Sequence, residues 1–313
     1  MLKIQNKPLV SIIVITYNSS NYVIETLESI KKQTYQNIEL IVSDDCSTDD
    51  TVEICRNWMV EHKERFIRTE LLIIPNNTGI SANCNRGIKV AHGVWVKLIA
   101  GDDTLLSNCI SSNISYIMTH PMVSILQSNA VIYDSFFNDD RQINISNIAN
   151  IDIFNKKHSP LKQYKLLLRR NQIIATAIFI KRDIFKMLGG FDEELKLIED
   201  YPFWLKATQA GFRIDAFNEI TVNYRLNSSC SSSRKNSETF MSSEYAKCLL
   251  LFNSKYRKDN VNKLSYYLYN LGLKLTIYFN LKGLNKNNIL GKFLYRVFIP
   301  SIMRFPFLYI EKI

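Results

Sequence analysis

Two adjacent carboxylates, Asp102 and Asp103, directly follow an apolar stretch that ends at Gly101. Because like charges side by side repel, the pair requires a compensating partner. A hard cation such as Mg²⁺ or Mn²⁺ binds carboxylate oxygens and commonly carries the phosphates of a nucleotide in its remaining positions. Such a site suits a diphosphate leaving group, whose developing charge the metal neutralises. The competing interpretation is a helix N-cap ahead of Thr104, which favours the same residue types.

Polar side chains also cluster at two other points, each after an apolar run: Thr16, Tyr17 and Asn18, then Asp44 and Asp45. An aromatic ring can stack on a nucleobase, and a carboxylate can accept a hydrogen bond from a base N–H group. Tyr17 and Asp45 could therefore form a nucleoside pocket. Each residue taken alone is equally compatible with a turn, with Asp45 in an Asx-turn before Ser47.

A third acidic pair, Glu199 and Asp200, precedes Tyr201 and Pro202 at an expected helix start. A carboxylate in this position can act as a general base if it faces the same cleft as the other acidic pair. The alternative is an acidic first turn that complements the helix dipole. The pattern alone leaves open which of the two carboxylates points inward.

These residues must be positioned by the elements between them, and the first hundred residues alternate regularly. Apolar, β-branched runs predict buried strands over 9–17, 38–45, 69–75 and 94–100, with amphipathic helices between them. This β-α-β-α-β-α-β order predicts an α/β fold with a mostly parallel sheet and helices on both faces. The polar clusters then share the carboxyl edge of the sheet, where such folds bind ligands.

After residue 104 the pattern is less regular. We expect a helix over 105–119, a strand over 122–133, a strand followed by a helix within 171–185, and short strands within 213–225. A Ser-rich linker follows Leu226. The sequence over 238–313 predicts a helical tail rich in basic and aromatic residues, in which Pro300 and Pro306 would interrupt any long helix. This tail would either rest on an anionic membrane surface or pack on the core or in an oligomer interface.

Bulk composition narrows the function further. The formal net charge of +10 favours polyanionic partners, but no reading helix or stacking motif indicates nucleic acid. The six Cys and four His lack zinc-ligand spacing, and Tyr17 and Asn18 stand where a dinucleotide fold needs glycines. We find no signal peptide and no apolar stretch of about 18 residues, so a cytoplasmic location is expected, peripheral at most to the membrane.

Taken together and in order, the motifs resemble those of the family-2 glycosyltransferases, which have the GT-A fold. The resemblance runs from about Val10 to about Arg225 and rests on these segments: SIIVITYN, QTYQNIELIVSDDCSTDDT, NNTGISANCNRGI, AHGVWVKLIAGDD, LGGFDEELKLIEDYPFWLKATQAGF and VNYR. It implies an inverting enzyme that uses a nucleotide-sugar donor and a metal ion.

The resemblance also implies residue roles. Tyr17 and Asp45 would contact the nucleobase, with Thr16 and Asn18 shaping the first loop. Asp102 would lie near the ribose and the metal, and Asp103 would ligate Mn²⁺ or Mg²⁺. Asp200 would remove the proton of the acceptor hydroxyl, with Glu199 as the second choice. Asn85 would belong to the donor-binding set.

Two positions depart from the family pattern. Ala100 stands where the family often has a first Asp before the acidic pair, so metal binding rests chiefly on Asp103. Cys84 stands where the family often has Arg before Asn85. Any diphosphate contact of that Arg is therefore lost or comes from elsewhere, for which Arg86 is a candidate.

We therefore expect a GT-A domain over residues 1–230, with a nucleotide-binding half (1–104) and an acceptor-binding half (105–230), followed by a helical basic extension (231–313). The expected reaction moves a sugar from a UDP-sugar to a saccharide or lipid-linked saccharide during cell-surface polysaccharide synthesis. The alternative is a homologue that binds nucleotide sugar without turnover. The sequence does not fix an oligomeric state.

Overall fold

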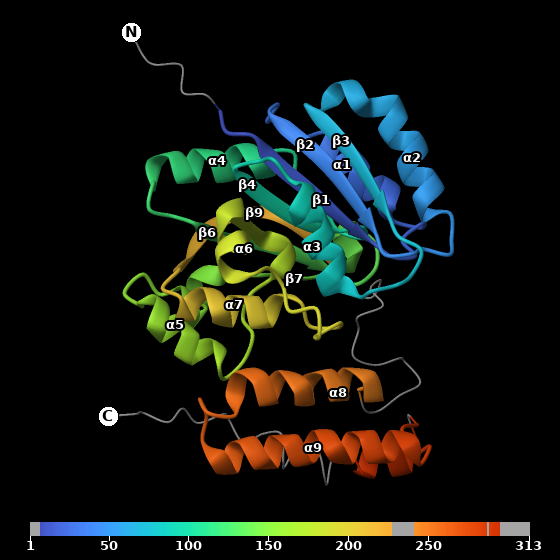
Figure 1. The fold of residues 1–313 in the computed structure, drawn as a ribbon, viewed down its shortest axis with the longest axis vertical. Helices are drawn as coiled ribbons and strands as arrows, with labels where there is room; N and C mark the ends of the chain where they lie inside the picture. The colour runs from blue at the N-terminus through green and yellow to red at the C-terminus, as the bar shows by residue number, and fades with distance from the viewer. Residues whose placement is uncertain (1–6, 227–240, 287, 295–313) are drawn as a thin grey trace.

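The computed structural model describes residues 7–226, 241–286 and 288–294, and these form one mixed sheet flanked by helices (Figure 1). The strands are β1 Val10–Thr16, β2 Ile38–Asp44, β3 Arg68–Ile73, β4 Trp95–Ala100, β5 Thr104–Leu105, β6 Ile125–Tyr133, β7 Gln142–Ile145, β8 Ile178–Lys181 and β9 Ile214–Arg225. The helices are α1 Val23–Lys31, α2 Thr51–His62, α3 Ile80–Val90, α4 Cys109–Thr119, α5 Pro160–Leu167, α6 Arg182–Leu188, α7 Asp200–Gln209, α8 Ser243–Phe252 and α9 Lys263–Leu281.

The strand order is β3-β2-β1-β4-β8-β6-β9-β5, with β7 paired to β6. Strands β1 to β4 are parallel, as their continuous apolar runs predicted. In this register Thr16 lies opposite Asp44, and Ile15 lies opposite Ala100. The polar residues that follow β1, β2 and β4 are therefore brought to one edge of the sheet.

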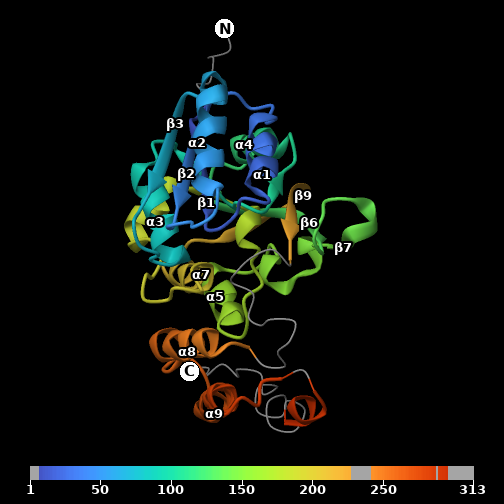
Figure 2. The ribbon, with the colours of Figure 1, turned by 90° about the vertical axis from the view of Figure 1, so that its right-hand side faces the viewer.

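Helices cover both faces of this sheet, and each face has its own hydrophobic core. Helices α1, α2 and α4 contribute to one core through residues such as Leu27, Cys55 and Ile114. Helices α3, α6 and α7 contribute to the other through Cys84, Ile184 and Phe203. Figure 2 shows α1 and α3 on opposite sides of the strands. This arrangement is the α/β sandwich that the alternating sequence pattern predicted.

Two sequence expectations were wrong in detail. The helix expected over 105–119 begins only at Cys109, because Thr104 and Leu105 pair as β5 with β9. The short strands expected within 213–225 are one continuous strand, β9. Its pairing with β6 shifts register between Ser128 and Asn129, so that the polar pair at 218–219 bulges out without ending the strand.

The described part of the C-terminal segment is helical and packs on the rest of the chain. Ala246, Leu249 and Phe252 of α8 belong to the same core as α7, and the rings of Phe252 and Tyr201 lie 4.7 Å apart. In Figure 1, α8 and α9 lie beneath α5 and α7. The Ser-rich linker and the final basic, aromatic residues 295–313 lie outside the described residues.

None of the helices in the described ranges is both long enough and apolar enough to cross a membrane.

Candidate active site

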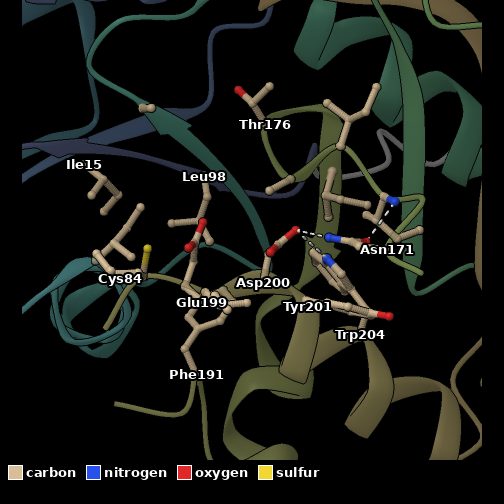
Figure 3. A pocket seen from close by; sticks show the side chains of 18 of the residues that line it. Ile15, Cys84, Leu98, Asn171, Thr176, Phe191, Glu199, Asp200, Tyr201 and Trp204 are labelled. Carbon is tan, nitrogen blue, oxygen red and sulfur yellow. Dashed lines mark hydrogen bonds between the residues drawn. The ribbon is translucent and has the colours of Figure 1, made fainter. Parts of the chain in front are cut away.

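A cavity of about 840 Å³ lies at the carboxyl ends of β1 and β4 (Figure 3). Its lining includes both acidic pairs: Asp102, Asp103, Glu199 and Asp200. The first pair lies in the turn between β4 and β5, whereas the second lies at the start of α7. The opposite wall is built by the C-terminal segment through Met241, Tyr245 and Tyr269. The fold thus brings together the two carboxylate pairs that the sequence singled out.

The first acidic pair is held against the sheet by close packing. A side chain at Gly101 would place its Cβ 2.9 Å from Thr16 Cγ2, so only glycine allows the ends of β1 and β4 to approach this closely. Asp103 is almost completely buried, and Arg225 donates its backbone N–H to Asp103 Oδ1 at 2.9 Å. Burial, and then the charge of Asp102, raise the pKa of Asp103 well above its ordinary value.

The buried guanidinium of Arg225 fixes the backbone beside this pair. Its Nε donates to the carbonyl oxygen of Asp102 at 2.9 Å, while Nη1 reaches the carbonyl of Ser135 and Nη2 the carboxylate of Glu25. Aromatic rings lie over the guanidinium at 4.5 and 4.0 Å, those of Tyr22 and Phe137. Arg225 therefore ties the end of β9 to the turn that carries both aspartates.

The first acidic pair fits a hard divalent cation. Asp102 and Asp103 both line the cavity, and burial together with the charge of Asp102 raises the pKa of Asp103, so a bound cation would favour its ionised form. Among the described residues, no third His, Cys, Asp or Glu completes a ligand cluster. The other coordination positions would then fall to phosphate oxygens and water, as is usual for Mg²⁺.

The second acidic pair is asymmetric in its hydrogen bonding. Asn171 Nδ2 and Trp204 Nε1 both donate to Asp200 Oδ2, at 3.0 and 3.2 Å. Burial, and then the charge of Asp200, raise the pKa of Glu199 to about 8. Burial also raises the pKa of Asp200, but its two donors oppose the shift because they favour the ionised form. Burial and the neighbouring carboxylate thus favour the protonated form of Glu199, whereas the two donors favour the ionised form of Asp200.

The end of β1 is organised by Asp44. Thr16 Oγ1 and Ser47 Oγ donate to Asp44 Oδ2 at 2.8 and 2.6 Å. Asn18 adopts a left-handed conformation with φ 49° and accepts from the backbone N–H of Thr48 at 2.8 Å. Thr16 and Asn18 therefore organise the loop that follows β1. Neither residue lines the 840 Å³ cavity.

Tyr17 and Asp45 lie at the same edge in different environments. Tyr17 is 40% exposed. Asp45 is buried, and its carboxylate accepts from the N–H and hydroxyl of Thr78, from the N–H of Gly79 and from Arg86 Nη2. The ion pair with Arg86 measures 2.7 Å. Asp45 thus holds the loop after β3 and the guanidinium of Arg86.

Asn85 and Arg86 serve contacts within the protein. The amide of Asn85 donates to Phe191 O at 3.0 Å and accepts from Phe191 N–H at 2.9 Å, which clamps the loop before α7. Arg86 is bound to Asp45 and to Thr78 Oγ1. Asn85 lies outside the lining of the cavity, and the guanidinium of Arg86 is held by Asp45 and by Thr78 in the loop after β3.

Sequence reasoning missed three residues that organise the site. Arg225 ends the motif VNYR, and the mixed polar sequence of β9 gives no sign that its guanidinium is buried. Asn171 lies just before an apolar run, where an isolated amide gives no signal of its contact with Asp200. Trp204 stands one helical turn after Asp200, and this i, i+4 spacing could have indicated their contact.

The mixed sheet with its carboxylate-lined cavity is a fold of the GT-A type. The family model of glycosyl transferase family 2 matches residues 11–189, which is more than half of the chain, and the chain therefore belongs to this family.

Curated relatives agree with this assignment. The chain is 28% identical over 245 residues to the Escherichia coli protein named UDP-Glc:alpha-D-GlcNAc-diphosphoundecaprenol beta-1,3-glucosyltransferase WfaP, covering 77% of this chain and 86% of WfaP. It is 30% identical over 200 residues to an uncharacterised glycosyltransferase of Haemophilus influenzae, covering 64% of this chain and 72% of that protein.

Solved structures share the fold at low identity. The crystal structure of S. aureus TarS 1-349 in complex with UDP-GlcNAc matches with a TM-score of 0.60 and 19% identity, covering 95% of this chain and 89% of that one. The mannosyltransferase PcManGT from Pyrobaculum calidifontis, in complex with GDP-Man and Mn²⁺, matches with a TM-score of 0.53 and 16% identity, covering 96% and 73%. These matches support the fold.

Proposed function

We propose that this chain is a metal-dependent, inverting transferase that moves a hexosyl or N-acetylhexosaminyl unit from a UDP-sugar to a hydroxyl of a saccharide or lipid-linked saccharide. The observation that carries the proposal is that both acidic pairs line a single cavity. One pair suits a metal and diphosphate, and the other suits a proton acceptor. A reaction that displaces a diphosphate with a hydroxyl needs both groups in one place.

Asp102 and Asp103 would hold the metal, and Asp200 would serve as the base. Bound Mn²⁺ or Mg²⁺ would neutralise charge on the leaving diphosphate. The acceptor oxygen forms a bond to the anomeric carbon while the bond to the diphosphate oxygen breaks, and the hydroxyl proton passes to Asp200. Because a single displacement approaches from the opposite side, the anomeric configuration inverts.

The state of the second acidic pair favours Asp200 over Glu199 as the base. A base must be ionised, and the donors Asn171 and Trp204 favour the ionised form of Asp200. Glu199, with its pKa raised to about 8, stays protonated at neutral pH. A protonated neighbour also relieves the repulsion that a second negative charge would impose. Glu199 would thus keep Asp200 available without itself removing the proton.

Donor binding would involve the loops after β1 and β3. Tyr17 is exposed and free to stack on a base, whereas Asp45 already accepts from four donor groups. We therefore assign Asp45 mainly to organising this wall of the donor site, with Thr16 and Asn18 shaping the loop beside it. Asn85 would act through the 191–193 loop. The choice of UDP is supported by the relatives whose names carry UDP-sugars.

A panel of nucleotide sugars, with and without Mn²⁺, tests the proposal by thermal unfolding. A ligand that binds only the folded state raises the melting temperature by mass action. We expect UDP-sugars to raise it in the presence of Mn²⁺ and far less in its absence. GDP-mannose serves as the comparison donor. If no nucleotide sugar gives a metal-dependent shift, the donor assignment is wrong. Binding without transfer to any acceptor would favour the non-catalytic alternative.

We further propose that the chain rests on an anionic membrane surface through α9. The face opposite its buried residues exposes large apolar side chains at helical spacing: Leu264, Tyr267, Leu271, Tyr278 and Leu281. Between Asp259 and Glu311 the sequence contains five Lys, two Arg and no acidic residue. An apolar stripe within a purely cationic segment complements an anionic lipid surface.

A further inference from the structure

We propose that the acceptor carries a phosphate or diphosphate group, which Arg169 and Arg170 bind beside the catalytic base. This inference rests on the proposed function, because it concerns the acceptor side of the same cavity. The shared chemistry is a phosphate ester within one sugar or polyol unit of the reacting hydroxyl. A lipid-linked sugar diphosphate and a polyol-phosphate polymer would both present it.

Four arginines line the cavity, and two of them are already engaged. Arg225 is held by carbonyl oxygens and by Glu25. Arg257 is buried and donates to Leu168 O at 2.9 Å and to the hydroxyl of Tyr201 at 2.6 Å. The positive charges of Arg225 and Arg257 therefore serve the fold.

Arg169 and Arg170 differ from these two residues. Both are exposed at the cavity lining, and neither forms an ion pair with any residue in the described ranges. With the Gln172 amide turned so that its oxygen faces Arg170, that oxygen accepts from the guanidinium at 2.9 and 3.2 Å, and this neutral partner leaves the charge of Arg170 uncompensated. Two adjacent guanidinium groups without a carboxylate partner favour an anionic ligand, and planar donors match phosphate oxygens well.

The position of the two arginines assigns them to the acceptor. Arg170 immediately precedes Asn171, whose Nδ2 donates to Asp200 Oδ2 at 3.0 Å. Consecutive Cα atoms lie about 3.8 Å apart. The backbone of Arg169 and Arg170 is therefore only one or two residues from Asn171, which contacts the base. The donor diphosphate belongs at Asp102 and Asp103. An acceptor whose hydroxyl reaches Asp200 extends from there past Arg169 and Arg170.

The segment that leads to the two arginines is itself basic. Between Asp152 and Asp183 the sequence contains no acidic residue, and the stretch up to Arg170 also holds Lys156, Lys157, Lys162 and Lys165. Clustered charge of one sign attracts ligands of the opposite sign. A neutral saccharide would gain nothing from this charge.

Binding of N-acetylglucosamine 1-phosphate tests the inference, with the methyl glycoside of N-acetylglucosamine as the uncharged comparison. Both are titrated calorimetrically into protein saturated with UDP and Mn²⁺, so that the donor site is already filled. We expect the phosphate ester to bind at least about tenfold more tightly than the glycoside, as charge-assisted hydrogen bonds to phosphate require. In the double variant Arg169→Ala/Arg170→Ala this preference should disappear.

Lys162→Ala is the matched control, because it removes an exposed cation of the same basic segment that does not line the cavity. It should leave the preference intact, and all variants should bind UDP with unchanged affinity. Equal affinity for ester and glycoside in the wild type would overturn the inference. So would a double variant that loses UDP affinity but keeps the preference, because the arginines would then belong to the donor site.

UDP titrated alone separates this inference from the proposed function. If UDP does not bind the wild type in the presence of Mn²⁺, the proposed function fails, whatever the phosphate ester does. The two sources of phosphate are then compared as acceptors: a short prenyl diphosphate of N-acetylglucosamine and a glycerol-phosphate oligomer. Transfer to either one that depends on Arg169 and Arg170 supports the inference and identifies the source. Transfer to a neutral oligosaccharide at equal efficiency contradicts it.

Discussion

Asn171 Nδ2 lies 3.0 Å from Oδ2 of Asp200, and the same oxygen accepts from Trp204 Nε1 at 3.2 Å. The two donors reach the carboxylate from different elements, Asn171 from the loop before β8 and Trp204 from α7 itself. They fix the orientation of the carboxylate and favour its ionised form inside a cavity that would otherwise favour the neutral acid.

Replacing Asn171 with Ala should raise the pKa of Asp200, because one donor that stabilises the charge is lost. A base loses activity as pH falls through its pKa, so the acid side of the pH–kcat profile should move to higher pH by about one unit. Trp204→Phe should shift the profile in the same direction. The control Asn108→Ala, at an exposed site outside the cavity lining, should leave the profile in place. An unchanged profile in Asn171→Ala would show that this contact does not tune the base.

The raised pKa of Glu199 makes the stability of the fold depend on pH. With a folded-state pKa of about 8 against the ordinary 4.5, the folded form binds a proton that the unfolded chain lacks between these values. The free energy of unfolding should therefore fall as pH rises through this window. Glu199→Gln should flatten that slope and be more stable than the wild type at pH 8 by about 2 kcal/mol, allowing for solvent access to the cavity.

Denaturant unfolding at several pH values checks this expectation, with Glu193→Gln as the exposed control. Because the ionisation of Asp200 is linked to that of Glu199, a small residual slope should remain in Glu199→Gln. Parallel slopes for the wild type and Glu199→Gln would mean that Glu199 ionises normally in the folded protein.

Arg225 should matter far more to stability than an exposed arginine does. Arg225→Met removes the donors to Asp102 O and Ser135 O and leaves those carbonyls buried, at a cost of about 3 kcal/mol. Arg225→Lys should recover only part of this loss, because an ammonium cannot reproduce the planar fork. Arg141→Met, which breaks an exposed pair with Asp134 at 3.8 Å, should cost about 0.5 kcal/mol or less. Similar losses in Arg225→Met and Arg141→Met would contradict the role of Arg225.

Membrane association through α9 can be measured by sedimentation with lipid vesicles. The wild type should sediment with phosphatidylglycerol vesicles and not with phosphatidylcholine vesicles, and salt should weaken the binding. The triple variant Leu264→Gln/Tyr267→Gln/Leu271→Gln should lose most of it. Met122→Gln and Val60→Gln, at exposed apolar residues elsewhere, are the controls. Retention of binding by the triple variant would place the membrane contact outside α9.

Much of the nucleotide-side architecture could be predicted from local pattern. Strands β1, β2 and β4 are largely buried on both faces, so their sequences are mostly apolar runs followed by polar residues at one edge. That Asp102 and Asp103 share one site with Glu199 and Asp200 was expected from the family resemblance, which rests on the order of the motifs. What local pattern did not reveal were contacts between distant segments, such as Arg225 with Asp102 O and Asn171 with Asp200.

The C-terminal helices illustrate the same limit. Their amphipathic pattern indicated helices, but it did not indicate that Tyr245 and Tyr269 would form a wall of the cavity. That contact depends on Arg257, which ties the segment after α8 to Leu168 and Tyr201. A buried arginine that donates to carbonyl oxygens has no signature in sequence, because its partners are backbone atoms.

The central claim is that Asp200 takes the acceptor proton while Glu199 remains protonated. The most direct test compares kcat for sugar transfer in Asp200→Asn and Glu199→Gln at pH 7, once UDP and Mn²⁺ binding are shown to be intact in both. We expect Asp200→Asn to lower kcat by about 100-fold or more, whereas Glu199→Gln, which imitates the protonated acid, should keep kcat within about threefold of the wild type. A near-normal rate in Asp200→Asn, or a greater loss in Glu199→Gln, would contradict the central claim.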